Sequence, residues 1–242
     1  MELAGARILV TAGSRRLGAA IATDLAGWGA DVAITYRTRP GDAEAVVAQI
    51  ADRGRSAFAV RADVAHREEA HAAVRAAAEA LGGLDGVVHC ASAGFAPKPL
   101  AELTEEDVDN ALGATLRGAL FVAQAAAEHL ADGGAVVFIG DLAALRGWPA
   151  FLAHSAAKGG LRPLTSGLAR SLAPRVRVSM VHPGTVLPEE GATPEEQERD
   201  VDATLLRRAG SPHDVSRAVR YLLEAPFVTG EELVVDGGRR LR

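Results

Sequence analysis

Three polar residues in the second half of the chain, Asp141, His154 and Lys158, have side chains and a spacing suited to acid–base chemistry. His154 and Lys158 are four residues apart in a segment with helical periodicity, so both side chains point to the same side of a helix. A histidine, whose ordinary pKa is about 6.5, can donate a proton near neutral pH, whereas an aspartic acid can do so only where burial keeps it neutral. The sequence therefore predicts a proton donor, His154 or Asp141, and leaves the choice between the two open.

A second segment, residues 11–18 with the sequence TAGSRRLG, has the composition of a phosphate-binding turn. It joins a predicted strand over Ala6–Thr11 to a predicted helix over Leu17–Trp28. The first backbone N–H groups of a helix and the positive end of its dipole attract an anion such as a diphosphate. Only Gly13 and Gly18 are glycines in this turn, so a plain strand-to-helix connection is the alternative interpretation.

Basic residues near the next predicted strand bear on which nucleotide the turn would bind. The strand over Asp31–Tyr36 is followed by Arg37, Thr38 and Arg39, without the Asp or Glu that usually accepts a hydrogen bond from the ribose 2′-OH of NAD. Guanidinium groups instead bind a 2′-phosphate through paired, charge-assisted hydrogen bonds. These residues favour NADPH over NADH, with Arg37 and one of Arg15 and Arg16 as the expected phosphate ligands.

Short apolar runs alternate with amphipathic stretches along the whole chain. Besides the first two strands, strands are predicted over Ser56–Val60, Gly86–Cys90, Ala135–Ile139, Arg177–Val181 and Glu232–Val235. Besides the first helix, helices are predicted over Asp42–Arg53, Arg67–Leu81, Thr104–Leu130 and Phe151–Leu172. This alternation predicts an α/β fold: a Rossmann-type, doubly wound parallel sheet of about seven strands with helices on both faces, and ligands beyond the carboxyl ends of the strands. We expect residues 1–242 to form one such domain.

Composition narrows the class of partner. The chain has 242 residues, is 48% hydrophobic and has a formal net charge of -5, and no run of Lys or Arg forms a nucleic-acid-binding stripe. No apolar run approaches the length of a membrane span, no signal peptide precedes the first strand, and Cys90 is the single cysteine. We therefore expect a cytoplasmic protein with a small-molecule substrate, and no spacing of residues predicts a metal site.

Residues 186–208 include the acidic and polar run PEEGATPEEQERD. A mobile lid over the substrate site is one interpretation of this segment. An ordinary solvent-exposed helix is the other.

The chain resembles the short-chain dehydrogenase/reductase family along nearly its whole length. The resemblance rests on motifs in family order: the turn at 11–18, Asp63-Val64, His89-Cys90-Ala91-Ser92, His154 with Lys158, Pro183-Gly184, and Val235-Asp236-Gly237-Gly238. It implies hydride transfer with NADPH (NADP⁺) and a homo-oligomer, a dimer or a tetramer. The cofactor contacts that the turn, the strand ends and the resemblance imply are Gly13, Ser14, Arg15, Arg16, Leu17, Gly18, Tyr36, Arg37, Thr38, Asp63, Val64, Ala91, Ser92, Lys158, Pro183, Gly184, Thr185 and Val186.

Within that family the pattern is most similar to the pteridine reductase and dihydromonapterin reductase branch. The similarity lies in Arg16-Leu17-Gly18, in Tyr36-Arg37-Thr38 and in Asp141, where most relatives carry a catalytic serine. Phe95 falls near the position at which that branch stacks a pterin ring, although core packing is an equal explanation. The resemblance implies reduction of a carbonyl or of a pterin-like C=N bond.

The sequence departs from the family pattern at the proton donor. The family has Tyr-x-x-x-Lys, whereas this chain has His154 four residues before Lys158, and Thr115 stands where a helix asparagine is expected. Asp141 lies thirteen residues before His154, the spacing that the family uses between its serine and its tyrosine. We expect His154 to be the general acid, with Lys158 and Asp141 assisting. The alternatives are an NADPH-binding protein that has lost reductase activity, and non-redox acid–base chemistry such as dehydration or cyclisation.

Overall fold

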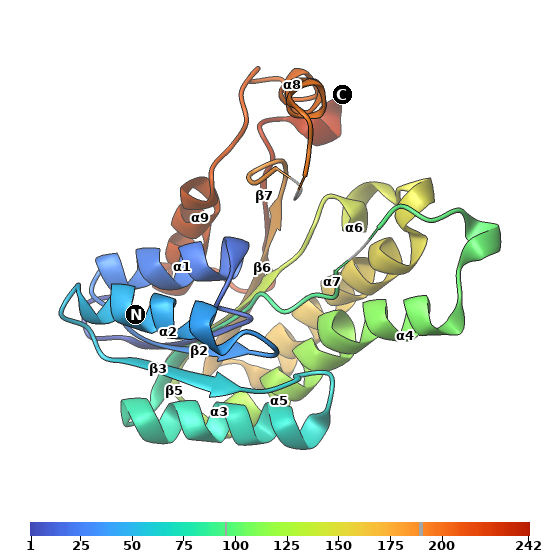
Figure 1. Cartoon of the computed structure of the whole chain (residues 1–242). Coiled ribbons are helices and arrows are strands. Elements are labelled where there is room, and N and C mark those ends of the chain that lie inside the picture. Colours follow the sequence, from blue (N-terminus) through green and yellow to red (C-terminus); the bar gives the residue numbers. More distant parts are fainter. Residues whose placement is uncertain (95, 189–190) are drawn as a thin grey trace.

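One parallel sheet forms the centre of the molecule (Figure 1). The computed structural model describes residues 1–94, 96–188 and 191–242. Within these ranges the sheet has seven strands in the order β3-β2-β1-β4-β5-β6-β7, all paired in parallel. The strands are β1 (Arg7–Thr11), β2 (Asp31–Tyr36), β3 (Ala57–Arg61), β4 (Leu84–His89), β5 (Leu130–Ile139), β6 (Val176–Pro183) and β7 (Glu232–Val235). The predicted doubly wound parallel sheet is confirmed.

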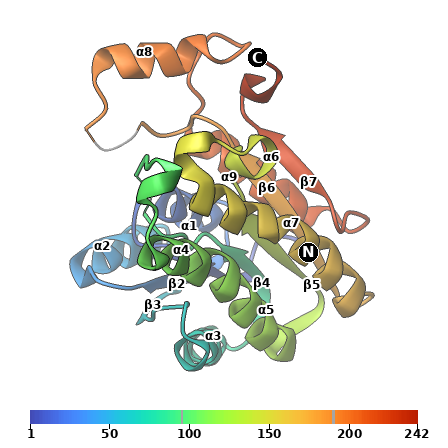
Figure 2. The same cartoon turned by 90° about the vertical axis from the view of Figure 1, so that its right-hand side faces the viewer.

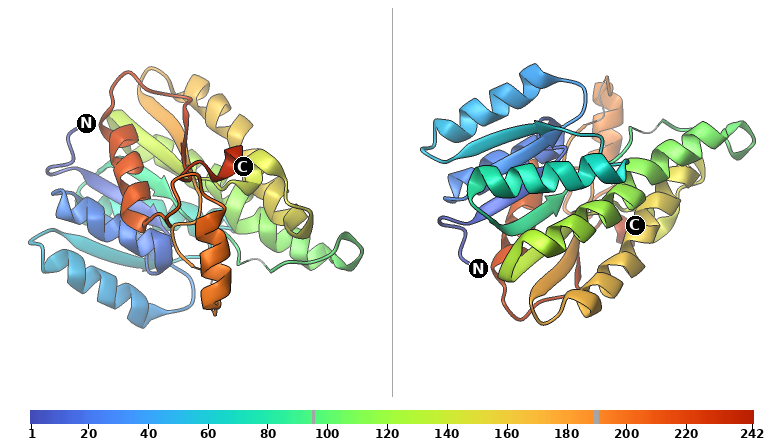
Figure 3. Two further views of the ribbon diagram at one scale, coloured as in Figure 1. Left: turned by 90° about the horizontal axis from the view of Figure 1, so that it is seen from above. Right: turned by 90° about the horizontal axis from the view of Figure 1, so that it is seen from below.

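Helices cover both faces of the sheet, as Figures 2 and 3 show from the side, from above and from below. The helices packed on one face are α1 (Arg16–Gly27), α2 (Pro40–Ala51) and α9 (Pro212–Glu224). Those on the other face are α3 (Arg67–Leu81), α5 (Gly118–His129) and α7 (Leu152–Leu172), with α4 (Glu105–Leu112) against α7. Because both faces of the central strands are buried, those strands are almost wholly apolar and fill two cores, one on each side.

The order of the strands places a crevice between β1 and β4. From β1 the chain passes to β2 and β3 on one side, and it returns to β4 on the other side of β1. Helices that follow β1 and β4 therefore turn to opposite faces, and a ligand can enter between them at the carboxyl ends of these strands. Thr11 and His89, which pair at those ends, mark the floor of the crevice.

The predicted helix over Thr104–Leu130 is wrong in two respects. It is interrupted by a π-helical turn, η2 (Gly113–Arg117), between α4 and α5, and Leu130 already belongs to β5, where it pairs with Leu84. The interruption occurs where the helix crosses the loop after β3. A Cβ atom at Gly118 would lie 3.0 Å from Cγ2 of Val64 and 3.1 Å from its carbonyl oxygen, so glycine permits this close approach. A single extra residue in a helical turn hardly alters the hydrophobic periodicity, so no pattern in the sequence indicated it.

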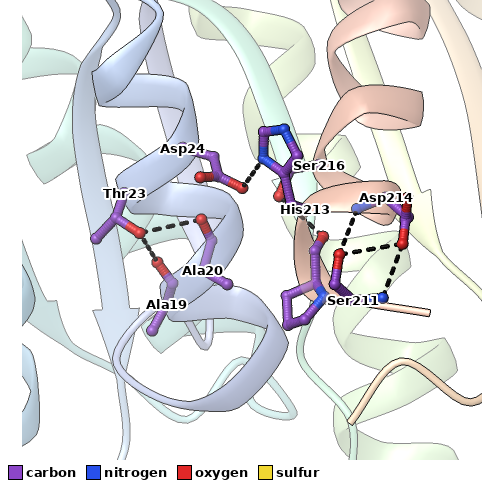
Figure 4. Close-up of polar contacts among 9 residues, drawn as sticks. Ala19, Ala20, Thr23, Asp24, Ser211, His213, Asp214 and Ser216 are labelled. Atoms are coloured by element: carbon purple, nitrogen blue, oxygen red, sulfur yellow. Dashed lines mark hydrogen bonds and ion pairs between the residues drawn. The ribbon is translucent and has the colours of Figure 1, made fainter. Parts of the chain in front are cut away.

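Helix α9 is attached to α1 by side chains near its amino end (Figure 4). Ser211 and Asp214 form a capping box that starts α9. Between them, His213 Nδ1 lies 3.2 Å from Oδ2 of Asp24 on α1. This contact fixes the helix that leads into β7.

Two short segments lie above the carboxyl ends of the strands. Helix α8 (Pro194–Asp202) begins with a capping box of Thr193 and Glu196, and the 3₁₀ turn η4 (Arg239–Leu241) follows β7. Figures 1 and 2 show α8 and the C-terminal turn side by side, outside the layers of the main body. The segment predicted as a lid over 186–208 thus contains an exposed helix, and its movement stays a prediction.

In the described ranges, no helix is long and apolar enough to cross a membrane. The same residues contain no group of three or more His, Cys, Asp or Glu side chains placed to hold a metal ion.

Candidate active site

A cleft of about 660 Å³ opens at the carboxyl ends of the strands. It brings together the three residues predicted to do acid–base chemistry and two of the predicted cofactor segments. The predicted residues that line it are Arg15, Arg16, Leu17, Gly18, Ser92, Asp141, His154, Lys158, Pro183, Gly184, Thr185 and Val186.

His154 and Asp141 face each other across this cleft. Nε2 of His154, in the first turn of α7, lies 3.5 Å from Oδ2 of Asp141, and the imidazole is buried. Asp141 follows β5 directly, and its Oδ1 accepts a hydrogen bond of 2.7 Å from the backbone N–H of Ala143 at the start of α6 (Ala143–Arg146). One carboxylate oxygen is thus held by the backbone while the other faces the imidazole.

The Asp141 carboxyl is ionised at neutral pH. Burial raises its pKa, but the adjacent imidazole of His154, the hydrogen bond from the Ala143 N–H and the positive charge of Lys158 lower it by more, so that its pKa lies below the ordinary value. An ionised carboxylate accepts hydrogen bonds and has no proton to donate. Of the two donors that the sequence left open, the charge state therefore favours His154.

Lys158 lies beneath the pair, on the same side of α7. Its Nζ donates a hydrogen bond of 2.8 Å to the carbonyl oxygen of Ile139 at the end of β5. Burial lowers the pKa of Lys158, and the carboxylate of Asp141 opposes that shift. An ammonium group has three donors, so Lys158 keeps donors for a ligand in the cleft.

A second buried histidine, His89, holds the end of β4 in place through hydrogen bonds at the base of the crevice. A carbonyl oxygen can only accept, so Nε2 of His89 donates to Ala114 (3.3 Å) and Nδ1 accepts from the hydroxyl of Thr11 (3.1 Å). The same hydroxyl oxygen accepts from the backbone N–H groups of Cys90 and Ala91. Burial and the charge of Lys158 lower the pKa of His89 to about 3, so it is neutral and fixes the strand end in place.

Thr115, which replaces the expected helix asparagine, lies in the π-helical turn and is buried. Its hydroxyl is 3.2 Å from that of Ser92, which lines the cleft. The hydroxyl of Thr115 therefore lies beside the cleft at the position where the family has an asparagine amide, and it contacts the hydroxyl of Ser92.

The turn after β1 has left-handed backbone at the two positions where it departs from the glycine pattern. Ala12 has φ +50° and Arg16 has φ +49°, in the region that glycine adopts without strain. At Gly18 a Cβ atom would lie 2.3 Å from the carbonyl oxygen of Ala12, so that position admits only glycine. The turn has therefore kept its shape at a cost in backbone strain.

The predicted contacts for the adenosine end lie outside this cleft. Tyr36 is the last residue of β2, Arg37 and Thr38 follow it, and Asp63 and Val64 lie after β3. The Nη1 of Arg37 is 3.6 Å from Oδ2 of Asp63, and the Arg37 side chain is 64% exposed. Exposed ion pairs of this kind contribute little to stability, so Arg37 can leave Asp63 and bind a phosphate at little cost in free energy.

Several residues that line the cleft were not predicted. They are Ala12, Cys90, Ala93, Gly94, Ile139, Gly140, Leu142, Trp148, Phe151, Leu187, Asp200 and Arg239. Trp148 and Phe151 contact each other edge to face at 6.1 Å between ring centroids, and Arg239 forms an ion pair with Asp200 on α8. No short-range spacing links β7, α8 and α7, so only the fold could reveal this side of the site. Phe95, the predicted pterin platform, lies outside the described residues.

Comparisons with known proteins agree with the fold and the cleft. A family model described as enoyl-(acyl carrier protein) reductase matches residues 11–240. An L-rhamnose 1-dehydrogenase (NAD(P)(+)) from Sphingomonas sp. (strain SKA58) is 34% identical over 247 residues, which cover 98% of this chain and 96% of the relative.

Solved structures give the same result. A short-chain dehydrogenase from Burkholderia cenocepacia J2315, in complex with NADP, is 39% identical, with a TM-score of 0.90 and 99% of each chain covered. A blue fluorescent protein from a metagenomic library, in complex with NADPH, is 33% identical, with a TM-score of 0.91 and 99% of each chain covered. With its fold, its collinear motifs and these relatives, the chain belongs to the short-chain dehydrogenase/reductase family of enzymes.

Proposed function

We propose that the protein is an NADPH-dependent reductase of a carbonyl or pterin-like C=N bond, with His154 as the general acid. The observation that carries this proposal is the pair of His154 and ionised Asp141, 3.5 Å apart, in the same cleft as Lys158. The pair occupies the place at which the family has a tyrosine and a serine.

When bound, NADPH would supply the hydride that forms the new C–H bond. His154, as an imidazolium, would give its Nε2 proton to the oxygen or nitrogen on which negative charge develops, and would be left neutral. Asp141, whose Oδ2 lies 3.5 Å from the same Nε2, would stabilise the positive charge of the imidazolium before transfer. Lys158 would hold the ribose through the donors that Ile139 does not use.

The choice of NADPH rests on the basic side chains around the turn and the end of β2. Arg15 and Arg16 line the cleft, Arg37 follows β2, and no carboxylate follows that strand directly. Arg37 would bind the 2′-phosphate, together with Arg15 or Arg16. Both NADP-bound relatives support this cofactor class.

The charge of Asp141 favours the C=N form of the substrate. Negative charge develops on the heteroatom in either case, but a pterin-like ring also carries N–H groups from which the carboxylate can accept a hydrogen bond, and a simple ketone has none. This asymmetry supports a pterin-like heterocycle, in keeping with the branch to which the sequence is most similar.

Incubation of the protein with NADPH and a panel of dihydropteridines, quinones and ketones tests the proposal. We expect loss of cofactor absorbance with at least one class, and faster turnover with NADPH than with NADH. Tight NADPH binding without turnover on any member would instead favour the non-redox or inactive alternatives.

We also propose that the protein is a homo-oligomer, a dimer or a tetramer, through α5 and α7. Leu120 on α5 is 46% exposed, and a Cβ atom at Gly159 or Gly167 on α7 would meet nothing within 4 Å. Light scattering coupled to gel filtration measures the mass directly, and a Leu120→Glu variant should be monomeric.

A further inference from the structure

Arg239, in the turn after β7, lies at the junction of two hollows. It lines the main cleft with His154 and Asp141, and it also lines a neighbouring hollow of about 570 Å³. Leu142 and Trp148 are shared by the two hollows in the same way. The two hollows therefore adjoin at these three side chains.

The hydrogen-bonding capacity of Arg239 is only partly used. Its Nη1 lies 2.8 Å from Oδ1 of Asp200 and donates to the hydroxyl of Thr185. Among the residues that the structure describes, its Nε and Nη2 make no hydrogen bond, although the side chain is only 25% exposed. A guanidinium offers five donors in a planar fork that matches a carboxylate, so half of this fork is available to a ligand.

Basic side chains line the second hollow, and their positive charge favours the binding of an anion. Two further arginines, Arg146 and Arg242, line it, and Nη1 of Arg146 donates a hydrogen bond of 3.0 Å to the main-chain oxygen of Arg242. None of the described side chains in its lining is acidic. Its remaining surface is apolar and aromatic, from Leu142, Trp148 and Pro149. A planar organic acid fits this combination, because its ring can pack on the indole while its anionic group pairs with arginine.

We propose that Arg239 binds a carboxylate of the substrate in the second hollow, so that the enzyme selects carbonyl or C=N compounds that carry an acidic group. The inference rests on the proposed function for the redox step, but it makes a separate claim about binding. Asp200 competes with the substrate for the same guanidinium, and its side chain on α8 is 37% exposed. A substrate carboxylate can bind at Nε and Nη2 while Asp200 stays at Nη1, and the negative charge of Asp200 then weakens that binding.

A binding measurement that needs no turnover tests this claim. The chain has two tryptophans, Trp28 and Trp148, so a Trp28→Phe background leaves Trp148 as a fluorescent reporter at the second hollow. With NADP⁺ present, 4-formylbenzoate and its methyl ester are titrated into this protein. We expect the acid to bind about 10- to 100-fold more tightly than the ester, the range expected for a hydrogen bond to a charged group.

Three variants separate Arg239 from general charge effects. Arg239→Gln should abolish the preference for the acid. Arg240→Gln removes the same charge from the exposed neighbour, which lines neither hollow, and should leave the preference unchanged. Asp200→Asn should strengthen binding of the acid several-fold, because it removes the competing carboxylate.

Equal binding of acid and ester, or an Arg239→Gln variant that loses NADP⁺ affinity while it keeps the preference for the acid, would overturn the proposal. If the acid binds through Arg239 but no aldehyde or pteridine oxidises NADPH, the binding claim stands and the proposed reductase function fails. The two proposals are thus judged by different readouts.

Discussion

Nε2 of His154 lies 3.5 Å from Oδ2 of Asp141, whose other oxygen accepts a hydrogen bond from the backbone N–H of Ala143. The carboxylate is ionised, so the pair places one negative charge against the imidazole that we propose as the proton donor. The His154–Asp141 pair therefore differs in charge from the serine and tyrosine of the family, whose side chains are both neutral hydroxyls.

Asp141→Asn tests whether this charge matters for catalysis. The amide keeps the shape of the side chain but removes the charge that stabilises an imidazolium. A hydrogen bond between charged groups contributes about 1.5–3 kcal/mol, so we expect kcat to fall about 10- to 100-fold with little change in NADPH affinity. An unchanged kcat would mean that Asp141 only shapes the loop after β5.

Arg37→Ala tests the choice of cofactor. Loss of a bidentate phosphate contact should raise the Kd for NADPH about 10- to 100-fold and leave the Kd for NADH nearly unchanged. Arg75→Ala, at an exposed position on α3, is the matched control. Equal weakening of both cofactors in Arg37→Ala would contradict the assignment of the 2′-phosphate.

His89 should make stability depend on pH. Its folded pKa of about 3 lies below the ordinary 6.5 because of burial and Lys158, so between these values the unfolded chain binds a proton that the folded chain does not. The contribution of neutral His89 to the free energy of unfolding is complete above pH 6.5. Between pH 6.5 and the folded pKa of about 3, this contribution falls by about 1.4 kcal/mol for each unit by which the pH is lowered.

Urea unfolding between about pH 7 and pH 5 measures this slope. A His89→Asn variant loses stability at every pH because it leaves a gap, but its slope should be shallower by about one proton. His66→Asn, at an exposed position, should keep the slope of the parent protein. Identical slopes in all three proteins would show that His89 does not titrate as the geometry requires.

Ala12→Gly should stabilise the protein. A left-handed backbone conformation destabilises the folded protein by about 1–2 kcal/mol at a non-glycine residue. Glycine removes this strain, but its greater freedom in the unfolded chain lowers the free energy of unfolding by about 0.4–1 kcal/mol, so the net gain is about 1 kcal/mol or less. Ala48→Gly, in the exposed middle of α2, should instead lose about 1 kcal/mol. A loss of stability in Ala12→Gly would show that Ala12 packs its methyl group to advantage.

The sequence predicted the sheet, and the position of several residues that line the cleft, for a physical reason. Apolar runs of strand length record burial on both faces, and the residues directly after them, such as Asp141 after β5, must lie at the same edge of a parallel sheet. Their spacing of four residues likewise predicted that His154 and Lys158 lie on the same side of one helix.

The features that sequence reasoning missed depend on contacts between distant segments. The π turn at Gly113–Arg117 lies where the helix passes the loop after β3, which Gly118 approaches closely at Val64. The place of Arg239 in the cleft depends on how α8 and the turn after β7 lie against each other. The charge of Asp141 was likewise open, because the sign of a pKa shift depends on the balance between burial and hydrogen bonds in three dimensions.

The rate of NADPH oxidation by His154→Gln, with saturating cofactor and the best substrate of the panel, tests the central claim most directly. Glutamine can donate a hydrogen bond but cannot transfer a proton, so we predict that kcat falls by about 10²- to 10⁴-fold while the Kd for NADPH is unchanged. A His154→Gln enzyme that keeps the parent kcat would contradict the assignment of His154 as the general acid.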